Sequence, residues 1–261
     1  MRSEGEASEV VIVATLGAPP RRRWRRARPQ PVEREAAPEP LPLTRVTVVT
    51  PEDLEGSAEA TGWLERMTRE DEAAAAFVDG ALRLVNRALH AHATAAQDPY
   101  AHEVSPAHAA ALRIGYGEGE QVAEGLWTEA RELVRREPRR RRAASLQPQE
   151  RVAAVLGGRQ RVEASETLLL RARLDLDQGR DREAALQLRA GLSALLAETA
   201  PRVGAAHEDD LAALRERESE VERLASAALR GEADPAGQAT LADTLARCER
   251  VLRRRRLAPD V

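Results

Sequence analysis

The residues most able to do chemistry gather in one short stretch, which holds four of the five histidines of this 261-residue chain. The stretch contains His90, His92, Asp98, Tyr100, His102, Glu103 and His108. Imidazole and carboxylate groups at this density are candidate zinc ligands or proton-transfer groups. His90 and His92 are two residues apart on a predicted helix, so their side chains point roughly 200° apart and cannot both face one ion. A metal site would need His92, His102 and His108 to converge through a loop that folds back. We interpret the stretch as a polar helix end with a capped loop, and we predict neither catalytic residues nor a metal site.

A second motif, Gly115-Tyr116-Gly117-Glu118-Gly119, has the glycine content of a phosphate-binding loop. Such a loop normally follows a strand and leads into a helix whose free backbone amides face the phosphate. Here a helix is predicted before the motif, and the carboxylates of Glu118 and Glu120 would repel a phosphate. We therefore interpret the glycines as a flexible connection between helices, and the sequence predicts no cofactor.

Arginine supplies all 40 basic residues, because the sequence contains no lysine. Together with the high alanine content, this is typical of a GC-rich bacterial genome, which favours arginine over lysine whatever the function. Clusters nevertheless stand out at 21–28, 135–142 and 253–256. The candidate nucleic-acid contacts are Arg21, Arg22, Arg23, Trp24, Arg25, Arg26, Arg139, Arg140, Arg141 and Arg142. Such clusters can neutralise several phosphates, and the Trp24 ring offers a face on which a base can stack.

The composition narrows the class of protein. Hydrophobic residues make up 43% of the chain but aromatic residues only 2%, so the core must use small aliphatic side chains, which suit closely packed helices. The single cysteine, Cys248, excludes an intrachain disulfide and a cysteine-based zinc site. No apolar run reaches the roughly 18 residues that span a membrane. Acidic residues precede the longest run, at 10–16, where a signal peptide would be basic. We expect a cytoplasmic protein that does not bind membranes.

The first part of the chain, residues 1–43, is predicted to be a flexible, partly disordered arm rich in proline and arginine. Residues 44–50 read TRVTVVT, a β-branched run bounded by prolines, which predicts a short strand. Pairing with the run at 10–15 would make a small N-terminal β-ribbon. Such a ribbon is marginally stable unless it packs on helices.

Residues 44–158 are predicted to form an irregular helical region with that one strand. Capping residues favour helices from Pro51 onward. The predicted helices lie at 69–96, 106–112, about 126–136, 139–146 and 149–156. The last two are separated at Pro148, because proline disfavours a helix interior.

Residues 159–261 are predicted to form a four-helix bundle-like region. Apolar residues recur at helical spacing in four segments. These segments are 162–178, a second from Asp181 to about 195, 208–230 and 235–256. The first two must be antiparallel because the turn between them is short, and Gly191 should let them approach closely. The predicted fold is therefore mainly α, a helical bundle or a short helical-hairpin array.

Part of this region resembles a single tetratricopeptide-type hairpin. The matching residues lie between Ala172 and Leu195, namely Gly179-Arg180 at the turn, Glu183-Ala184, and the small residues Ala190 and Gly191. No second copy occurs at the 34-residue period of a repeat array. The resemblance implies helical-hairpin geometry and peptide binding.

A second local resemblance is to HEPN-type four-helix domains, whose ribonuclease members carry an arginine followed at short spacing by a histidine. The pairs with this spacing are Arg202 and His207, Arg87 and His92, and Arg83 and His90. The resemblance implies ribonuclease activity.

The sequence as a whole favours a non-enzymatic helical scaffold or protein–protein interaction protein. Its expected partner is another protein, with a homo-oligomer as an option. The alternative is a nucleic-acid or ribosome-associated protein that uses the arginine clusters. A HEPN-like ribonuclease or a metal-dependent enzyme is the remote alternative.

Overall fold

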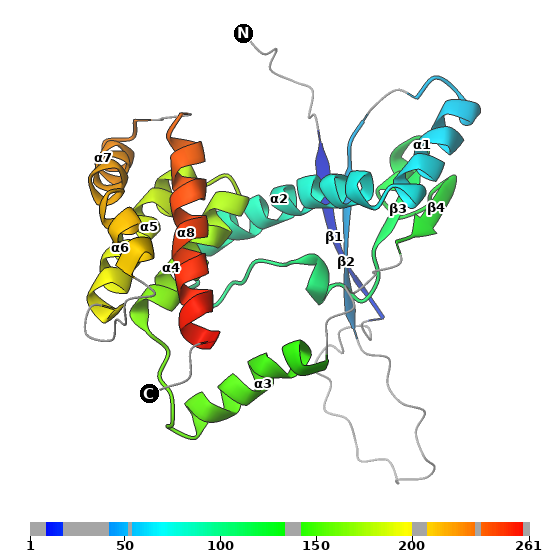
Figure 1. The fold of residues 1–261 in the computed structure, drawn as a ribbon. Coiled ribbons are helices and arrows are strands. Elements are labelled where there is room, and N and C mark those ends of the chain that lie inside the picture. The colour runs from blue at the N-terminus through cyan, green and yellow to red at the C-terminus, as the bar shows by residue number, and fades with distance from the viewer. Residues whose placement is uncertain are drawn as a thin grey trace, which may run out of the picture. The chain divides into compact units, whose positions relative to one another are not determined.

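The computed structural model describes residues 9–17, 42–51, 54–133, 142–199, 208–232 and 236–257, without the side chains of 142–147 and 256–257. Over these residues the fold is mainly α with two small antiparallel two-stranded sheets, as Figure 1 shows, and the predicted fold class is confirmed. The chain forms two compact units, 1–136 and 137–261, and each is described by itself. Within the described ranges, none of the helices has the length and apolar character needed to cross a membrane.

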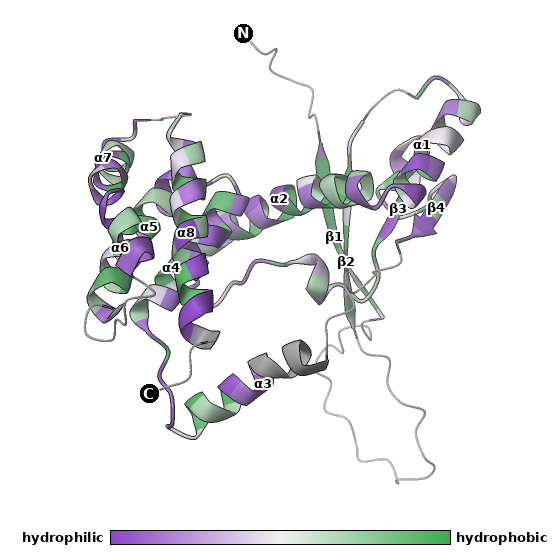
Figure 2. Ribbon diagram, in the orientation of Figure 1, coloured by the Kyte–Doolittle hydropathy of each residue, from purple (hydrophilic) through white to green (hydrophobic). Residues whose placement is uncertain are grey.

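The first unit contains the β-ribbon that the sequence predicts. Strands β1 (Val10–Leu16) and β2 (Leu43–Val49) pair antiparallel along their whole length. Five of the seven cross-strand pairs join residues of one type: Val10–Val49, Val11–Val48, Val13–Val46, Thr15–Thr44 and Leu16–Leu43. Hydrophobic colours run along both strands in Figure 2. β-Branched side chains form a ribbon here because they pack well on a pleated surface.

Two helices follow the ribbon. Helix α2 (Asp71–Ala96) is the predicted long helix. Helix α1 (Ser57–Arg69) begins later than the predicted start at Pro51, because Gly56 has a φ of +89°, which lies outside the helical region. Leu64 of α1 and Ala74 of α2 are buried together and form part of a small core.

A β-hairpin replaces the predicted helix at 126–136 and the predicted flexible glycine connection, and both of those predictions are wrong. Strands β3 (Arg113–Tyr116) and β4 (Glu129–Glu132) pair antiparallel, and Ile114 completes the core of the first unit. A Cβ on Gly115 would lie 2.5 Å from the carbonyl oxygen of Glu129, so the strands come together only because this residue is glycine. The predicted helix at 106–112 is reduced to a single 3₁₀ turn, η1 (Pro106–His108), and a second turn, η2 (Glu120–Val122), lies in the hairpin loop.

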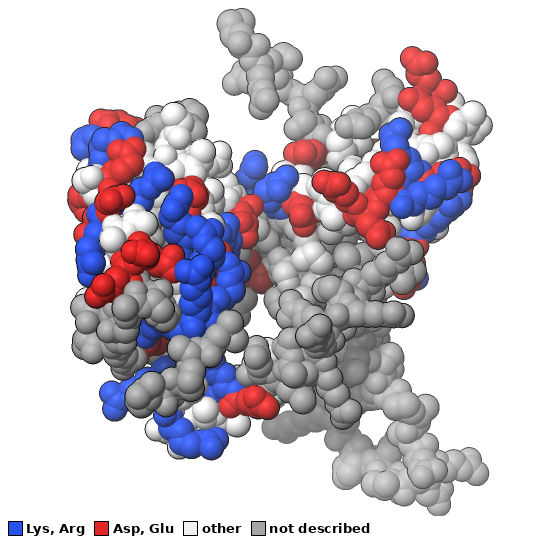
Figure 3. All heavy atoms as spheres, in the orientation of Figure 1, with Lys and Arg blue, Asp and Glu red and all other residues white. Residues whose placement is uncertain are grey.

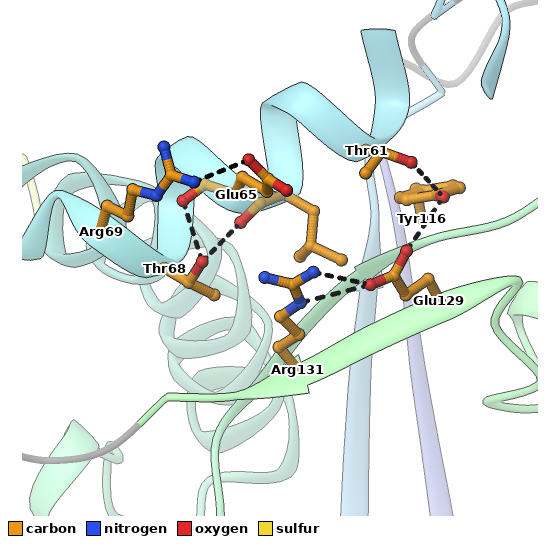
Figure 4. A network of polar contacts seen from close by, with 8 residues as sticks. Thr61, Glu65, Thr68, Arg69, Tyr116, Glu129 and Arg131 are labelled. Atoms are coloured by element: carbon orange, nitrogen blue, oxygen red, sulfur yellow. Dashed lines mark hydrogen bonds and ion pairs between the residues drawn. The ribbon is translucent and has the colours of Figure 1, made fainter. Parts of the chain in front are cut away.

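A chain of polar contacts joins this hairpin to α1 (Figure 4). The Tyr116 hydroxyl donates a hydrogen bond to Glu129 Oε2 at 3.3 Å and lies 3.1 Å from Thr61 Oγ1. Since the tyrosine proton is used on the carboxylate, Thr61 is the donor in the second bond. Arg131 donates twice to Glu129 Oε1, at 2.9 and 3.2 Å. The hairpin is thus held against α1 by both apolar packing and a connected polar network.

The second unit is helical throughout its described part. Its helices are α3 (Arg142–Leu156), α4 (Ala164–Asp177), α5 (Asp181–Thr199), α6 (Glu208–Arg215), α7 (Glu218–Leu229) and α8 (Gly237–Leu257). Helices α4 and α5 form the predicted antiparallel hairpin, and α5 also packs against α7 and α8. Leucines dominate the shared core, with Leu188, Leu192 and Leu195 of α5 almost fully buried at its centre.

Two predicted boundaries in this unit are wrong. Pro148 lies inside the continuous helix α3, where it removes one backbone hydrogen bond while the turns on either side continue. The predicted helix at 208–230 is divided into α6 and α7, where the Arg217 amide bonds to the carbonyl oxygen of Leu214 in a tighter turn. The turn lets Leu214 and Val221 enter one core, with α6 against α8 and α7 against α5.

Close packing at Gly191 sets the distance between α4 and α5. A Cβ at this position would lie 2.9 Å from Leu169 Cδ2 and 3.3 Å from Leu168 Cβ. Leu169 is itself buried in the core, so it has little room to move. The predicted role of Gly191 in close helix approach is confirmed.

We expect Gly191→Ala to destabilise the second unit by up to about 2.5 kcal/mol. Overpacking costs about 1–3 kcal/mol, and the gain in helix propensity offsets only about 0.5–1 kcal/mol of it. Cys248, the only cysteine, is buried in this unit, so a reagent reaches its thiol only when the unit opens. Burial also raises the pKa of this thiol to about 12. The measurement is the rate of Cys248 alkylation at increasing denaturant.

The matched control is Gly80→Ala in α2, where an added Cβ meets only Arg83 Nη2 at 3.9 Å. This change should leave Cys248 alkylation unaltered. An unchanged or slower alkylation rate in Gly191→Ala would contradict the packing argument.

Candidate interaction surface

The histidine-rich stretch folds back onto α2 through a single asparagine. The Asn86 side chain is 2% exposed, donates to the carbonyl oxygen of Val104 at 3.0 Å and accepts from the Val104 amide at 2.9 Å. With these two hydrogen bonds in place, Glu103 Oε1 lies 4.0 Å from His90 Nδ1. Sequence reasoning missed Asn86, although it is the only asparagine in the chain and lies beside Val85 of the apolar stripe.

The other histidines of the stretch do not converge. His108 Nδ1 accepts the Ser105 amide at 3.2 Å and so caps the turn η1, while the His92 side chain is exposed on α2. The described residues hold no group of three His, Cys, Asp or Glu side chains placed to bind a metal ion. The geometry is that of a capped loop after a helix end.

The arginine–histidine pairs of the HEPN resemblance form no enclosed site among the described residues. Arg202 and His207 lie outside the described residues. The other two pairs are on α2, where Arg83, Arg87, His90 and His92 are all exposed. A ribonuclease activity therefore stays a prediction.

The glycine-rich motif has a structural use. Gly115 is in β3, and a Cβ on Gly117 would lie 2.8 Å from Val122 Cγ2 and 3.2 Å from the Thr128 amide. Both glycines allow close packing inside the hairpin. The motif follows a strand, contrary to the sequence interpretation, but it leads only into the three-residue turn η2 and not into a helix.

Most of the predicted nucleic-acid contacts lie outside the described residues. These are Arg21, Arg22, Arg23, Trp24, Arg25, Arg26, Arg139, Arg140 and Arg141. Arg142 is the first residue of α3, and its side chain is outside the described part as well. Of the third cluster, Arg254 pairs with Asp210, and Arg255 donates to Thr199 Oγ1 at 3.3 Å.

Several other arginines of the second unit tie helices together. Arg173 of α4 donates to both oxygens of Glu249 on α8, at 2.9 and 3.1 Å, and these hydrogen bonds raise the pKa of its guanidinium. Arg189 of α5 donates to Glu222 of α7 at 3.3 Å. Within α8, Arg247 donates to Asp243 at 3.0 Å and lowers the pKa of that carboxyl. Figure 3 shows the resulting mixture of basic and acidic side chains on this unit. Arg250 and Arg253 are exposed on α8.

The surface that stands out is one face of the β-ribbon. Side chains alternate along a strand, and directly opposed residues share a face. Val11, Val13, Thr15, Thr44, Val46 and Val48 therefore form one face, which we call the valine face. Val13 is 66% exposed and Val46 42% exposed. The valine face carries no charge, although charged residues make up 32% of the chain.

The opposite face of the ribbon is covered in its middle part, whereas Val10, Leu16 and Leu43 at its ends are exposed. Thr47 is 6% exposed, and α2 packs against β2. The Arg45 guanidinium lies beside Gly125, where an added Cβ would be 2.7 Å from Arg45 Nη1. Gly125 has a φ of +78°, so this position favours glycine for its backbone as well as for its size. These contacts on one side leave the valine face outward.

Among the described residues no third strand pairs with either long edge of the ribbon, since the sheet consists of β1 and β2. An open edge presents unpaired backbone N–H and C=O groups to any strand that approaches. Comparisons with protein-family models, curated proteins and solved structures found no match. Fold and site together define a mainly α chain of two units whose most distinctive surface is an exposed, uncharged β-ribbon.

We expect Asn86→Ala to destabilise the first unit by about 1–3 kcal/mol, because it leaves the Val104 amide and carbonyl without their partner. All three tryptophans are in residues 1–136, so tryptophan fluorescence during denaturation reports on this unit. Thr94→Ala is the control, since its exposed hydroxyl bonds only to the His90 carbonyl of its own helix. Equal denaturation midpoints for Asn86→Ala and Thr94→Ala would contradict the role of the two hydrogen bonds between Asn86 and Val104.

Proposed function

We propose that this chain is a non-enzymatic helical interaction protein that binds another protein through its β-ribbon. The observation that carries the proposal is the exposure of large apolar residues on both strands. The exposed residues are Val10, Val13, Leu16, Leu43 and Val46. Contiguous exposed apolar surface is a mark of protein-binding sites in soluble proteins. Arg45, held at Gly125, is the single charged residue in either strand.

The chemistry of the ribbon fits a protein partner better than a small molecule or a phosphate. Its valine face offers no basic group, while its edges offer backbone hydrogen bonds of the kind that strand addition uses. Burial of a valine side chain in a contact contributes on the order of 1.5 kcal/mol. Helix α2 packs against β2, where Thr47 is buried, and the valine face and both ends of the opposite face stay accessible.

The first test places a photoreactive amino acid, p-benzoyl-phenylalanine, at Thr15 on the valine face, in cells that naturally express the protein. Thr15 is exposed, so the substitution should be tolerated. We expect irradiation to join the chain covalently to a protein at this position. The matched control places the same group at Leu229, an exposed apolar residue of α7. Equal yields at both positions, or none at Thr15, would remove the basis for the proposal.

Nucleic-acid binding through the arginine clusters is the second proposal. The observation that favours it is that Arg250 and Arg253 are exposed one turn apart on α8. Two phosphate contacts there would contribute about 1.8 to the slope of log affinity against log salt for duplex DNA. Reversing both charges, in R250E/R253E, should reduce the slope by that amount in mobility-shift titrations.

The control for this second test is R83E/R87E, which reverses two exposed arginines on α2. It should leave the salt slope unchanged. Wild-type protein that binds neither RNA nor DNA at low salt would exclude the second proposal and leave the first intact.

A further inference from the structure

We propose that the ribbon's partner is a second copy of this chain, and that the two copies pair β1 against β1 in an antiparallel, two-fold symmetric, four-stranded sheet. The inference rests on the proposed function, because it names the partner of the same surface. Three features of the ribbon support it: the chemistry of the β1 edge, the register that self-pairing gives, and the position of Arg45.

The β1 edge lacks the usual protection against strand pairing. Exposed edge strands are normally guarded by charged residues, proline or bulges. The β1 sequence, VVIVATL, contains no charged residue, no proline and no glycine, and all seven of its residues pair regularly with β2. Nothing in the strand therefore opposes the addition of another strand at its outer edge.

Self-pairing about Val13 matches uncharged residues with one another, and Thr15 is the one polar residue among them. A two-fold axis at Val13 places Val13 opposite its own copy, and it sets Val10 opposite Leu16, Val11 opposite Thr15 and Ile12 opposite Ala14. Each pair joins residues whose side chains point to the same face, because the positions differ by an even number. The valine faces of the two copies then form one continuous apolar surface, with the most exposed valine at its centre.

The β2 edge is less suited to the same contact. A two-fold axis at Val46 would set Arg45 opposite Thr47 of the other copy. The two Arg45 side chains would then be diagonal neighbours about 7–8 Å apart, on the same face. Like charges at that distance oppose pairing, whereas β1 brings no charge to its axis.

Pairing also strengthens the ribbon itself. A two-stranded ribbon is marginally stable in water unless it packs against a helix or belongs to a sheet of three or more strands with an apolar face. Helix α2 already packs against β2, and self-pairing would add a strand beside β1. The four-stranded sheet β2–β1–β1–β2 meets the second condition. Two-fold contacts of this kind are the commonest arrangement in homo-oligomers.

The experiment measures the molar mass of the full chain by light scattering across a concentration series. We expect wild-type protein to approach twice 28.5 kDa. Val13→Asp places two carboxylates face to face across the axis and should return the mass to 28.5 kDa. Val46→Asp is the matched control, because Val46 is the cross-strand neighbour of Val13 on the same face but lies one strand further from the axis. It should remain a dimer.

A mixture of Val13→Asp and Val13→Arg chains separates lost pairing from lost folding. Each variant alone should be monomeric, and the mixture should recover the doubled mass, because opposite charges then meet at the axis. A mixture that stays monomeric would overturn the proposal, as would wild-type protein that is monomeric up to its solubility limit.

The remaining outcomes are equally decisive. Loss of the dimer in both Val13→Asp and Val46→Asp would show that the valine faces stack instead, and loss in Val46→Asp alone would assign the contact to β2. Monomeric wild-type protein that still forms an adduct at Thr15 with a different protein would refute self-pairing and retain the interaction function. Monomeric wild-type protein that also forms no adduct at Thr15 would refute both.

Discussion

The approach of α4 to α5 at Gly191 is the contact on which the second unit depends. Aromatic residues make up only 2% of the chain, so the core has few large side chains with which to fill gaps. Leucine and alanine can exclude water only if the helices come close together, and Gly191 permits this against Leu169. The leucines of α5 then meet α7 and α8, and arginine–carboxylate pairs such as Arg173–Glu249 join the helices at the edge of the core.

The first unit has fewer buried apolar side chains than the second and leaves more of its apolar surface uncovered. Its core is small, with Leu64, Ala74 and Ile114 buried and larger side chains only partly covered. The β-ribbon contributes one face to the unit through Thr47 and Arg45 and leaves its valine face outside. Apolar surface that the chain itself does not cover is the physical reason for assigning the interaction function to this part of the molecule.

Much of the helical architecture could be predicted from the sequence, because apolar residues recur at helical spacing over long segments such as 71–96 and 181–199. The β3–β4 hairpin could not, since four-residue strands are too short for an alternation signal and their pairing depends on the space that Gly115 leaves. The division between α6 and α7 was missed because it serves a core shared with α5 and α8. Among candidate site residues, the histidines were identified, but Asn86, which positions their loop, was not.

The ribbon shows most clearly which structural features the sequence could predict and which it could not. The sequence by itself determined the mainly α fold, the strand at 44–50, the possibility that it pairs with the run at 10–15, and the lack of charge on that run. It could not decide which face of the ribbon is covered, because apolar residues occupy odd and even positions of β1 alike and the period of two carries no direction. Only the tertiary structure decided that, by placing the Arg45 guanidinium beside Gly125 and burying Thr47 on the same side, which turned the valine face outward.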